Sequence, residues 1–431
     1  MKKLNLNKAP VLILVFLAVA SCSDDRPDAL DRAAQEFVKL ALQLGEYDSD
    51  YVDAYLGPAE WAASAKEDLL PREELAAAIA DLYEDLDEMF VAEGESAVRH
   101  RALLRNVRAM DARMRMANGE TYPFAEEARL IYDAVLPEYD FEDFDAALEK
   151  IDALFPGDGD VADRVDAFME SLAIPEDKVD AVLGLAIDEC RRRTVEHIAL
   201  PDSEGFVLEY VNGVNWSGYN WYQGDNTSLM QINTDFSLKI DRAIDLGCHE
   251  GYPGHHVWNV LVENRVLGDR GWIEFSIYPL FSPYALIGEG SANYGIDLAF
   301  PDDEKIAYER DVLFPSAGLD PEQATTLNQL NELKRKLAHS QVATAQRYLD
   351  GKITREEAIE QRRRFGLSSR ERAEQSVRFI EQYRSYVLNY SLGQDIVRDY
   401  IEGQGQDPDS RWDAFERMLT ELVTASDMTA D

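Results

Sequence analysis

Three of the six histidines in the chain lie within eight residues, in the stretch HEGYPGHH at positions 249–256. Zinc is bound in proteins by imidazole and carboxylate groups, and a catalytic zinc site uses three protein ligands and keeps one position for water. In the His-Glu-x-x-His arrangement, two histidines one helical turn apart bind the metal and the glutamate acts as general base. The stretch therefore predicts hydrolytic zinc chemistry, with His249 as a ligand and Glu250 as the base.

The spacing leaves two choices for the second histidine ligand. The residue four positions after His249 is Pro253, which cannot bind a metal. An unbroken helix would return His256 to the same face, but two turns rise by roughly 10 Å, too far to share one ion. Proline interrupts a helix and glycine tolerates the distortion. We therefore expect a two-residue bulge at Pro253 and Gly254 that brings His255 to the ligand position, with His256 as the alternative.

A third ligand is expected from a second helix, and Glu289 is the best candidate. It lies between Gly288 and Gly290 and is followed by Ser291. Glycines on both sides of a carboxylate allow other backbone segments to approach closely. The sequence thus predicts a site for one zinc ion on two helices.

Three segments resemble the bacterial family called domain of unknown function 885, which is grouped with the thermolysin-like, or gluzincin, metallopeptidases. The family pattern is His-Glu-x-x-Pro-Gly-His-His, then Glu-Gly-x-Ala-x-Tyr, then a Ser-Tyr-x-x-Gly-like element near the C-terminus. This chain carries HEGYPGHH at 249–256, EGSANY at 289–294 and NYSLGQ at 389–394. The resemblance extends from about Tyr210 to Tyr400.

The resemblance implies a gluzincin-like helical zinc hydrolase. Position by position, it implies that His249, His255 and Glu289 bind zinc and that Glu250 activates the bound water. It also implies that Tyr390 is a candidate donor to the oxyanion that forms at the scissile carbonyl.

The chain departs from this family at two places. Ser291 stands where the family usually carries Trp, which affects the expected shape of the substrate pocket. Ala345 and Leu349 stand where relatives carry Asp and His, before Thr354. Any role that relatives give to that Asp and His pair cannot be carried out here in the same way.

Apolar residues recur at three- and four-residue spacing over most of the chain, which is the pattern of amphipathic helices. Short strands are predicted only after Gly205, and helices return from Phe236. The expected fold is mainly α with a small antiparallel β-sheet, divided into an N-terminal helical region (31–200) and a catalytic region (201–431). The predicted helices are 31–44, 72–90, 97–116, 124–135 and 178–198, and the predicted strands are 206–211, 215–224 and 229–232.

Two further expectations concern the surroundings of the metal. The strand at 229–233 offers an edge to which an extended peptide can add, with Asn215, Tyr219, Asn220 and Tyr222 near the cleft. The alternative for the two tyrosines is that they simply pack the sheet. Asp245 precedes His249 by one helical turn, so it is either an acceptor that orients that imidazole or a surface carboxylate.

The N-terminus has the layout of a secretory signal, with three lysines before an apolar run at 9–20. The run ends in small residues directly before Cys22, which resembles the lipobox of bacterial lipoproteins. We therefore expect a signal peptide at 1–21, acylation of Cys22, and a tether at 22–30. The protein would reside in the cell envelope, facing the periplasm or the exterior, and would meet the membrane only through this anchor.

The chain is strongly acidic, with 82 Asp and Glu against 43 Lys and Arg and a formal net charge of -39. Such a charge repels phosphate backbones, so nucleic acid is not an expected partner. Apart from Cys22, the cysteines are Cys190 and Cys248, which form either one disulfide or two buried thiols.

Two functions are consistent with this sequence. The first is a zinc-dependent metallopeptidase that cleaves a peptide or another amide. It is favoured because Glu250, which does not need to bind metal, stands beside the expected ligands. The alternative is a surface lipoprotein that binds metal or peptide without turnover.

Overall fold

The computed structural model describes residues 28–429 except 215–217, 236 and 422. The predicted signal peptide and the lipidation site at Cys22 lie outside the described residues, as does Asn215 at the start of the second predicted strand. None of the helices within the described part of the chain is both long enough and apolar enough to cross a membrane.

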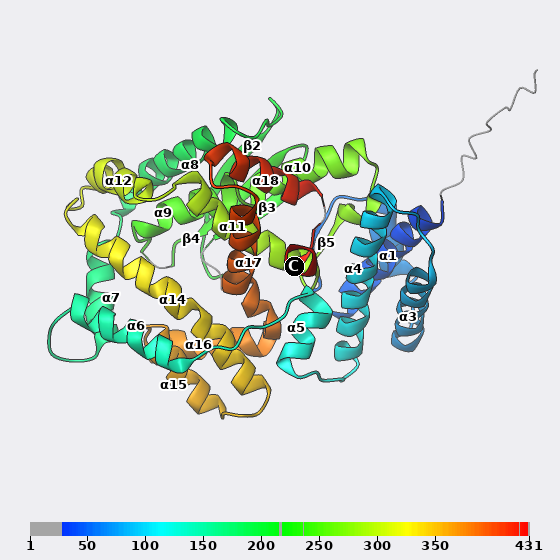
Figure 1. Ribbon diagram of the computed structural model, residues 1–431, viewed down its shortest axis with the longest axis horizontal. Coiled ribbons are helices and arrows are strands. Elements are labelled where there is room, and N and C mark those ends of the chain that lie inside the picture. The colour runs from blue at the N-terminus through cyan, green and yellow to red at the C-terminus, as the bar shows by residue number, and fades with distance from the viewer. Residues whose placement is uncertain (1–27, 215–217, 236, 422, 430–431) are drawn as a thin grey trace, which may run out of the picture.

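The N-terminal region consists mainly of helices, as the apolar periodicity predicts. The first helix shows the reason: its apolar residues fall on one buried face, and the Asp28 side chain accepts a hydrogen bond from the backbone N–H of Asp31 at its start. In Figure 1 the first, third and fourth helices pack beside one another at one end of the molecule. The helices are α1 (Ala29–Tyr47), α2 (Ala59–Glu67), α3 (Arg72–Glu88), α4 (Glu95–Ala117), α5 (Phe124–Tyr132), α6 (Phe141–Leu154), α7 (Val161–Ser171), η1 (Glu176–Lys178) and α8 (Val179–Val195).

The described strands form two small sheets. One is three-stranded in the order β2-β4-β3, with β3 antiparallel to β4 and β2 parallel to it. The other is an antiparallel pair, β1-β5, that joins the N-terminal region to the segment that ends at Pro279. The antiparallel pairing expected from the sequence is therefore present, but β2 departs from it, and β1 and β5 were not predicted. The strands are β1 (Val52–Tyr55), β2 (Gly205–Val211), β3 (Gly218–Gly224), β4 (Thr227–Asn233) and β5 (Ile277–Pro279).

Helices make up the remainder of the chain. Two of them, α11 and α17, lie against each other through the middle of the molecule (Figure 1). The helices are α9 (Asp241–Leu246), η2 (Gly247–Gly251), α10 (His255–Leu261), η3 (Val262–Asp269), η4 (Ile273–Ser276), α11 (Pro283–Ala299), α12 (Glu304–Tyr308), η5 (Glu309–Leu313), α13 (Phe314–Ala317), α14 (Gln323–Leu349), α15 (Arg355–Phe365), α16 (Arg370–Tyr383), η6 (Arg384–Val387), α17 (Leu388–Gln404), α18 (Pro408–Thr420) and α19 (Ala425–Met428).

One hydrophobic core connects both ends of the described chain. It extends from Leu30 in α1 to Ala425 in α19 and includes buried residues of the sheet and of the segments that carry the histidines. A separate small cluster lies under α15 and α16. The elements around the histidines are therefore supported by packing from both halves of the chain.

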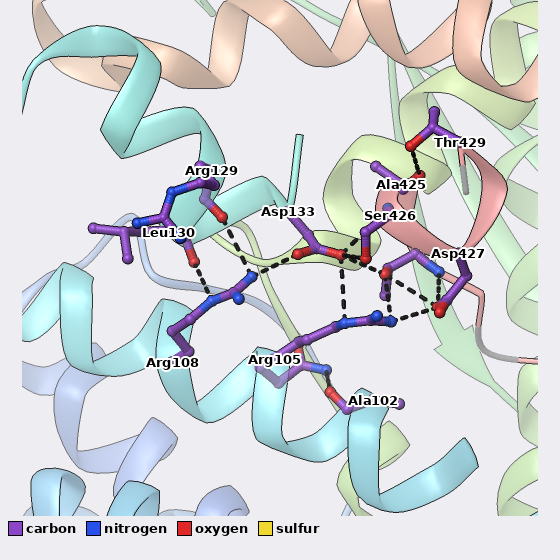
Figure 2. A network of polar contacts seen from close by, with 12 residues as sticks. Ala102, Arg105, Arg108, Arg129, Leu130, Asp133, Ala425, Ser426, Asp427 and Thr429 are labelled. Carbon is purple, nitrogen blue, oxygen red and sulfur yellow. Dashed lines mark hydrogen bonds and ion pairs between the residues drawn. The ribbon is translucent and has the colours of Figure 1, made fainter. Parts of the chain in front are cut away.

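A polar network attaches the C-terminal segment to α4 and α5 (Figure 2). Asp133, which ends α5 with a positive φ of 57°, accepts hydrogen bonds from Arg108 at 2.7 Å and from the Thr424 hydroxyl at 2.7 Å. Arg105 lies 3.4 Å from the same carboxylate and also pairs with Asp427. The Asp133 carboxylate thus joins residues that are almost 300 positions apart in the chain.

We expect Asp133→Asn to destabilise the protein by about 3 kcal/mol at neutral pH, because it leaves two partly buried arginines without their shared carboxylate. Asparagine tolerates the left-handed backbone at this position, so the substitution removes the charge without adding backbone strain. Burial alone would raise the pKa of Asp133, but hydrogen bonds from Ser426, Thr424 and Arg108 lower it overall. Thermal or urea unfolding of both proteins measures the difference.

The sign of the pH effect follows from the lowered pKa of Asp133. Its contribution is present above the unfolded pKa, about 3.9 for Asp, and is lost as the pH falls through the lower folded-state pKa. The difference in stability between wild type and Asp133→Asn should therefore shrink below about pH 4. An equal difference at all pH values would contradict this role of the carboxylate.

Candidate metal centre

The structure brings three of the predicted ligand residues together. One ligand atom from each of His249, His255 and Glu289 lies within 4.8 Å of the others. Glu289 Oε2 is 3.5 Å from His249 Nε2 and 3.9 Å from His255 Nε2. The two imidazole rings are perpendicular, with their centroids 4.7 Å apart. This arrangement of two imidazoles and one carboxylate matches the ligand set of a catalytic zinc site.

An interrupted helix produces this geometry. His249 lies in η2, a π-helical turn, and α10 begins at His255. Between them the Tyr252–Pro253 peptide bond is cis, and the Gly254 N–H donates to the Cys248 carbonyl at 3.0 Å. A Cβ on Gly254 would lie 1.8 Å from the His249 carbonyl oxygen, so only glycine fits there. The break predicted at Pro253 and Gly254 is what allows histidines six positions apart to face each other.

Helix α11 positions Glu289 through close contacts of its neighbouring glycines. A Cβ on Gly288 would meet the Trp258 ring at 2.5 Å, and one on Gly290 would meet the Gly393 carbonyl at 2.4 Å. Glycine at these positions therefore lets α10 and α17 approach α11 closely. The approach of α17 carries Tyr390 toward Glu289.

Two residues orient the candidate ligands. Asn293 Oδ1 lies 3.0 Å from His249 Nδ1, and the Asn293 amide donates to the Tyr390 carbonyl at 2.9 Å. Because Asn293 Oδ1 is an acceptor, it selects the tautomer with the proton on Nδ1 and leaves Nε2 of His249 facing Glu289. The Tyr386 hydroxyl donates to Glu289 Oε1 at 2.8 Å.

The ligand atoms that face one another in this cluster fit a metal cation. Glu289 Oε2 is buried and has no hydrogen-bond partner among the described residues. A buried carboxylate oxygen facing two imidazole nitrogens needs either a proton or a cation between them. Burial works against a charged His249, but the nearby carboxylates of Glu289 and Glu250 raise the pKa of His249 to about 8. Burial and the nearby charge of His249 lower the pKa of His255.

His256 points away from this cluster. Its Nδ1 lies 2.8 Å from the Ser228 hydroxyl and its Nε2 lies 3.0 Å from Glu204 Oε2, and the side chain is fully buried. Tyr252 and Arg191 also bind Glu204. Burial would raise the pKa of Glu204, but the bonds from these groups lower it to about 2. His256 therefore belongs to a network that holds α10 against the sheet.

A pocket of about 780 Å³ opens over the candidate ligands. Glu250 and Tyr390 both line it, together with β3 and residues from β1, α9, α16 and η6. The Glu250 side chain lies beside the first residue of β3, since a Cβ on Gly218 would be 3.7 Å from Glu250 Oε1. Partial burial in the pocket and the charge of Glu289 raise the pKa of Tyr390, so its hydroxyl remains a donor at neutral pH.

The structure corrects one expectation about this pocket and decides between the two alternatives for Asp245. The strand at 229–233, now β4, is the central strand and offers no edge, because β2 and β3 occupy both of its sides. The edge beside the pocket is β3, which carries Tyr219 and Asn220. Asp245 does not orient His249, since Asn293 takes that place; it pairs instead with Arg242 at 3.3 Å. Long-range packing decides both outcomes.

The two departures from the family pattern fall outside the lining of this pocket. Ser291 is buried and donates its hydroxyl to the Gly288 carbonyl at 3.1 Å. Ala345 is buried in α14. Neither of them, nor Leu349, lines the pocket over Glu289.

Some residues of the site were missed from the sequence. Tyr386 precedes Tyr390 by four positions, and Asn293 follows Glu289 by four positions. This spacing of one helical turn is a signal that could have indicated both residues. Tyr278, on β5, lines the pocket, and so does Asp53, on β1, which lies almost 200 positions before His249. No local pattern connects them to the histidines.

Cys190 and Cys248 form a disulfide, with their Cα atoms 5.4 Å apart. This bond decides between the two expectations for the cysteines. It links α8 to η2 at the residue directly before His249. Gly247 supports the same contact, since a Cβ there would lie 3.2 Å from the Ile187 backbone nitrogen. The disulfide therefore ties the backbone that carries His249 to α8.

No family model and no curated protein matches the chain. Among solved structures, it is similar to "the putative lipoprotein from Colwellia psychrerythraea", with a TM-score of 0.52 and 14% identity over 94% of this chain and 76% of that chain. A "putative lipoprotein of unknown function from Shewanella oneidensis" has a TM-score of 0.47 and 14% identity, over 85% and 74% of the two chains. The likeness to the Colwellia protein shows a shared fold.

Proposed function

We propose that this protein is a zinc-dependent hydrolase of the metallopeptidase kind, anchored to a membrane of the cell envelope by acylated Cys22. The observation that carries the proposal is the meeting of His249, His255 and Glu289 in one pocket with Glu250. The resemblance to the domain of unknown function 885 and to gluzincins agrees with it. The name of the Colwellia protein supports the lipoprotein part.

A zinc ion held by the two imidazoles and Glu289 would polarise the scissile carbonyl and lower the pKa of bound water to about 7. Glu250 then accepts the proton of the attacking water and passes it to the amide nitrogen as the C–N bond breaks. The Tyr390 hydroxyl donates to the carbonyl oxygen as negative charge develops there. Asn293 and Tyr386 keep His249 and Glu289 in position.

Binding without turnover is the second candidate function. The same ligands and the same pocket would serve a lipoprotein that captures metal or peptide. The position of Glu250 favours the enzyme, because its carboxylate lines the pocket and is not one of the three grouped ligands.

The test is the metal content of the purified protein, measured by mass spectrometry after incubation with zinc and gel filtration. We expect about one zinc per chain in the wild type, and its loss in the His249→Ala, His255→Ala and Glu289→Ala variants. His256→Asn is the matched control, since that histidine contacts Ser228 and Glu204 instead. It should retain zinc and lose thermal stability.

Hydrolysis of a peptide library by the zinc-loaded wild type completes this test. Cleavage that disappears on chelation and returns with zinc supports the hydrolase. If the wild type binds no zinc, or if the His256 variant is the one that loses it, the proposed site is wrong. If zinc is bound and no peptide is cleaved, the binding function is the better account.

A further inference from the structure

Two carboxylates in the pocket, Asp53 and Asp245, are used by neither the metal site nor the proposed reaction, and Asp245 is paired with Arg242. Asp53 lies in β1 and lines the pocket. Tyr219 reaches across from β3 and donates its hydroxyl to Asp53 Oδ1. Across the described parts of the chain, no Lys, Arg or His side chain forms an ion pair with Asp53. A carboxylate placed in a pocket without a cationic partner is a recognition group for a positive charge.

The charge of the surrounding groups points the same way. The described lining residues include four carboxylates, those of Asp53, Asp245, Glu250 and Glu289, and one guanidinium, that of Arg242. Arg242 already pairs with Asp245. A bound zinc dication would still leave the pocket with one negative charge in excess. Burial and the negative charge of Glu289 both raise the pKa of Asp53, so they disfavour its ionised form. A neighbouring cation would favour the ionised form again.

Asp53 and the candidate metal ligands face the same space. The charges of Asp53, Glu250 and Glu289 all act on the Tyr219 hydroxyl and, with burial, raise its pKa. Arg242 acts instead on His249. A ligand bound over the metal would thus share the pocket with the acidic Asp53 and Tyr219 pair.

We propose that Asp53 binds an ammonium group of the substrate, so that the pocket selects peptides that present a free amine close to the scissile bond. The inference rests on the proposed hydrolase function and deepens it. The amine is that of the peptide N-terminus or of a lysine side chain. Asp53 is a specificity residue, and Tyr219 positions it through the hydroxyl hydrogen bond.

The experiment compares tetrapeptides synthesised in pairs, with a free and with an acetylated N-terminus, on the zinc-loaded protein. A charged hydrogen bond of this kind predicts that kcat/KM for the free peptides exceeds that for the acetylated ones by about 10- to 100-fold. Acetylated peptides with and without one lysine form the second arm. Cleavage confined to the lysine-containing members would identify the side chain as the source of the amine.

Asp53→Asn is nearly isosteric and should remove this preference, lowering kcat/KM for free peptides by about 10- to 100-fold with little change for acetylated ones. Tyr219→Phe should have a smaller effect of the same kind. Asp245→Asn removes the same formal charge from the pocket and should affect both peptide forms equally. Equal loss for both forms in Asp53→Asn would overturn the assignment, as would equal cleavage of both forms by the wild type.

A binding measurement without turnover tests the role of Asp53 independently of the proposed reaction. Calorimetry with the zinc-loaded Glu250→Gln protein measures affinity for a free and an acetylated tetrapeptide without turnover. Tighter binding of the free peptide that depends on Asp53 supports ammonium recognition even if the wild type cleaves nothing, in which case only the hydrolase proposal fails. Equal affinity for the two forms, with cleavage of both, would refute the role of Asp53 and leave the hydrolase standing.

Discussion

Replacement of Glu250 by Gln is expected to slow peptide cleavage by about a thousandfold while leaving zinc bound, since positioned acid–base groups contribute roughly 10²- to 10⁴-fold. Glutamine has nearly the same shape, so it occupies the same place in the pocket beside Gly218. It cannot accept the proton of the attacking water. The Glu250 backbone carbonyl, which accepts a hydrogen bond from Asn220 at 2.6 Å, is unchanged by the substitution.

The measurement pairs kcat with metal content for wild type and variant. Glu204→Gln is a useful comparison, because Glu204 is a carboxylate outside the metal cluster. Its side chain binds His256, Tyr252 and Arg191. We expect it to lower stability more than kcat. Unchanged turnover in Glu250→Gln with full zinc content would exclude Glu250 as the base. A variant that lost its zinc would instead indicate that Glu250 is a ligand.

Gly254→Ala is expected to abolish high-affinity zinc binding, with a loss of about 100-fold or more. The new Cβ would lie 1.8 Å from the His249 carbonyl oxygen and 2.6 Å from the Cys248 carbonyl oxygen. Both are backbone atoms, so the strain can be relieved only by separating the segment that carries His249 from the start of α10. The free energy of unfolding should also fall, by about 3 kcal/mol or more.

Gly251→Ala provides the matched control within the same eight residues. A Cβ there would lie 3.5 Å from the Phe206 ring, an ordinary contact distance. That variant should bind zinc with nearly wild-type affinity. Zinc titration against a chromogenic chelator, combined with thermal unfolding, distinguishes the two glycines. Similar behaviour of both variants would show that the close approach at Gly254 does not determine the metal geometry.

The helical fold could be predicted from the sequence because an amphipathic period is a local property. The predicted helices at 31–44, 72–90 and 97–116 correspond to α1, α3 and α4 with ends that differ by a few residues. β1 and β5 were missed because they are four and three residues long, too short to show an alternating pattern. The parallel pairing of β2 with β4 was missed because strand direction in a sheet depends on how the chain returns, which local pattern does not encode.

The chemistry of the site was also indicated by sequence alone, through the types of residues at His249, Glu250 and Glu289. Tertiary structure decided which second histidine joins them. His255 and His256 are adjacent and chemically identical, and the choice depends on the backbone path through Pro253 and Gly254 and on the buried partners Ser228 and Glu204 that take His256.

The groups that orient and surround the candidate ligands come from parts of the chain that only folding brings together. Tyr386 reaches Glu289 because Gly290 and Gly393 let α11 and α17 touch. Asp53 enters the pocket from β1, almost 200 residues before His249. Residue types thus determined which chemistry is available to this protein. Packing between distant helices and strands decided the ligand geometry, the charge of the pocket and the position of the free carboxylate, because these depend on contacts that no short stretch of sequence contains.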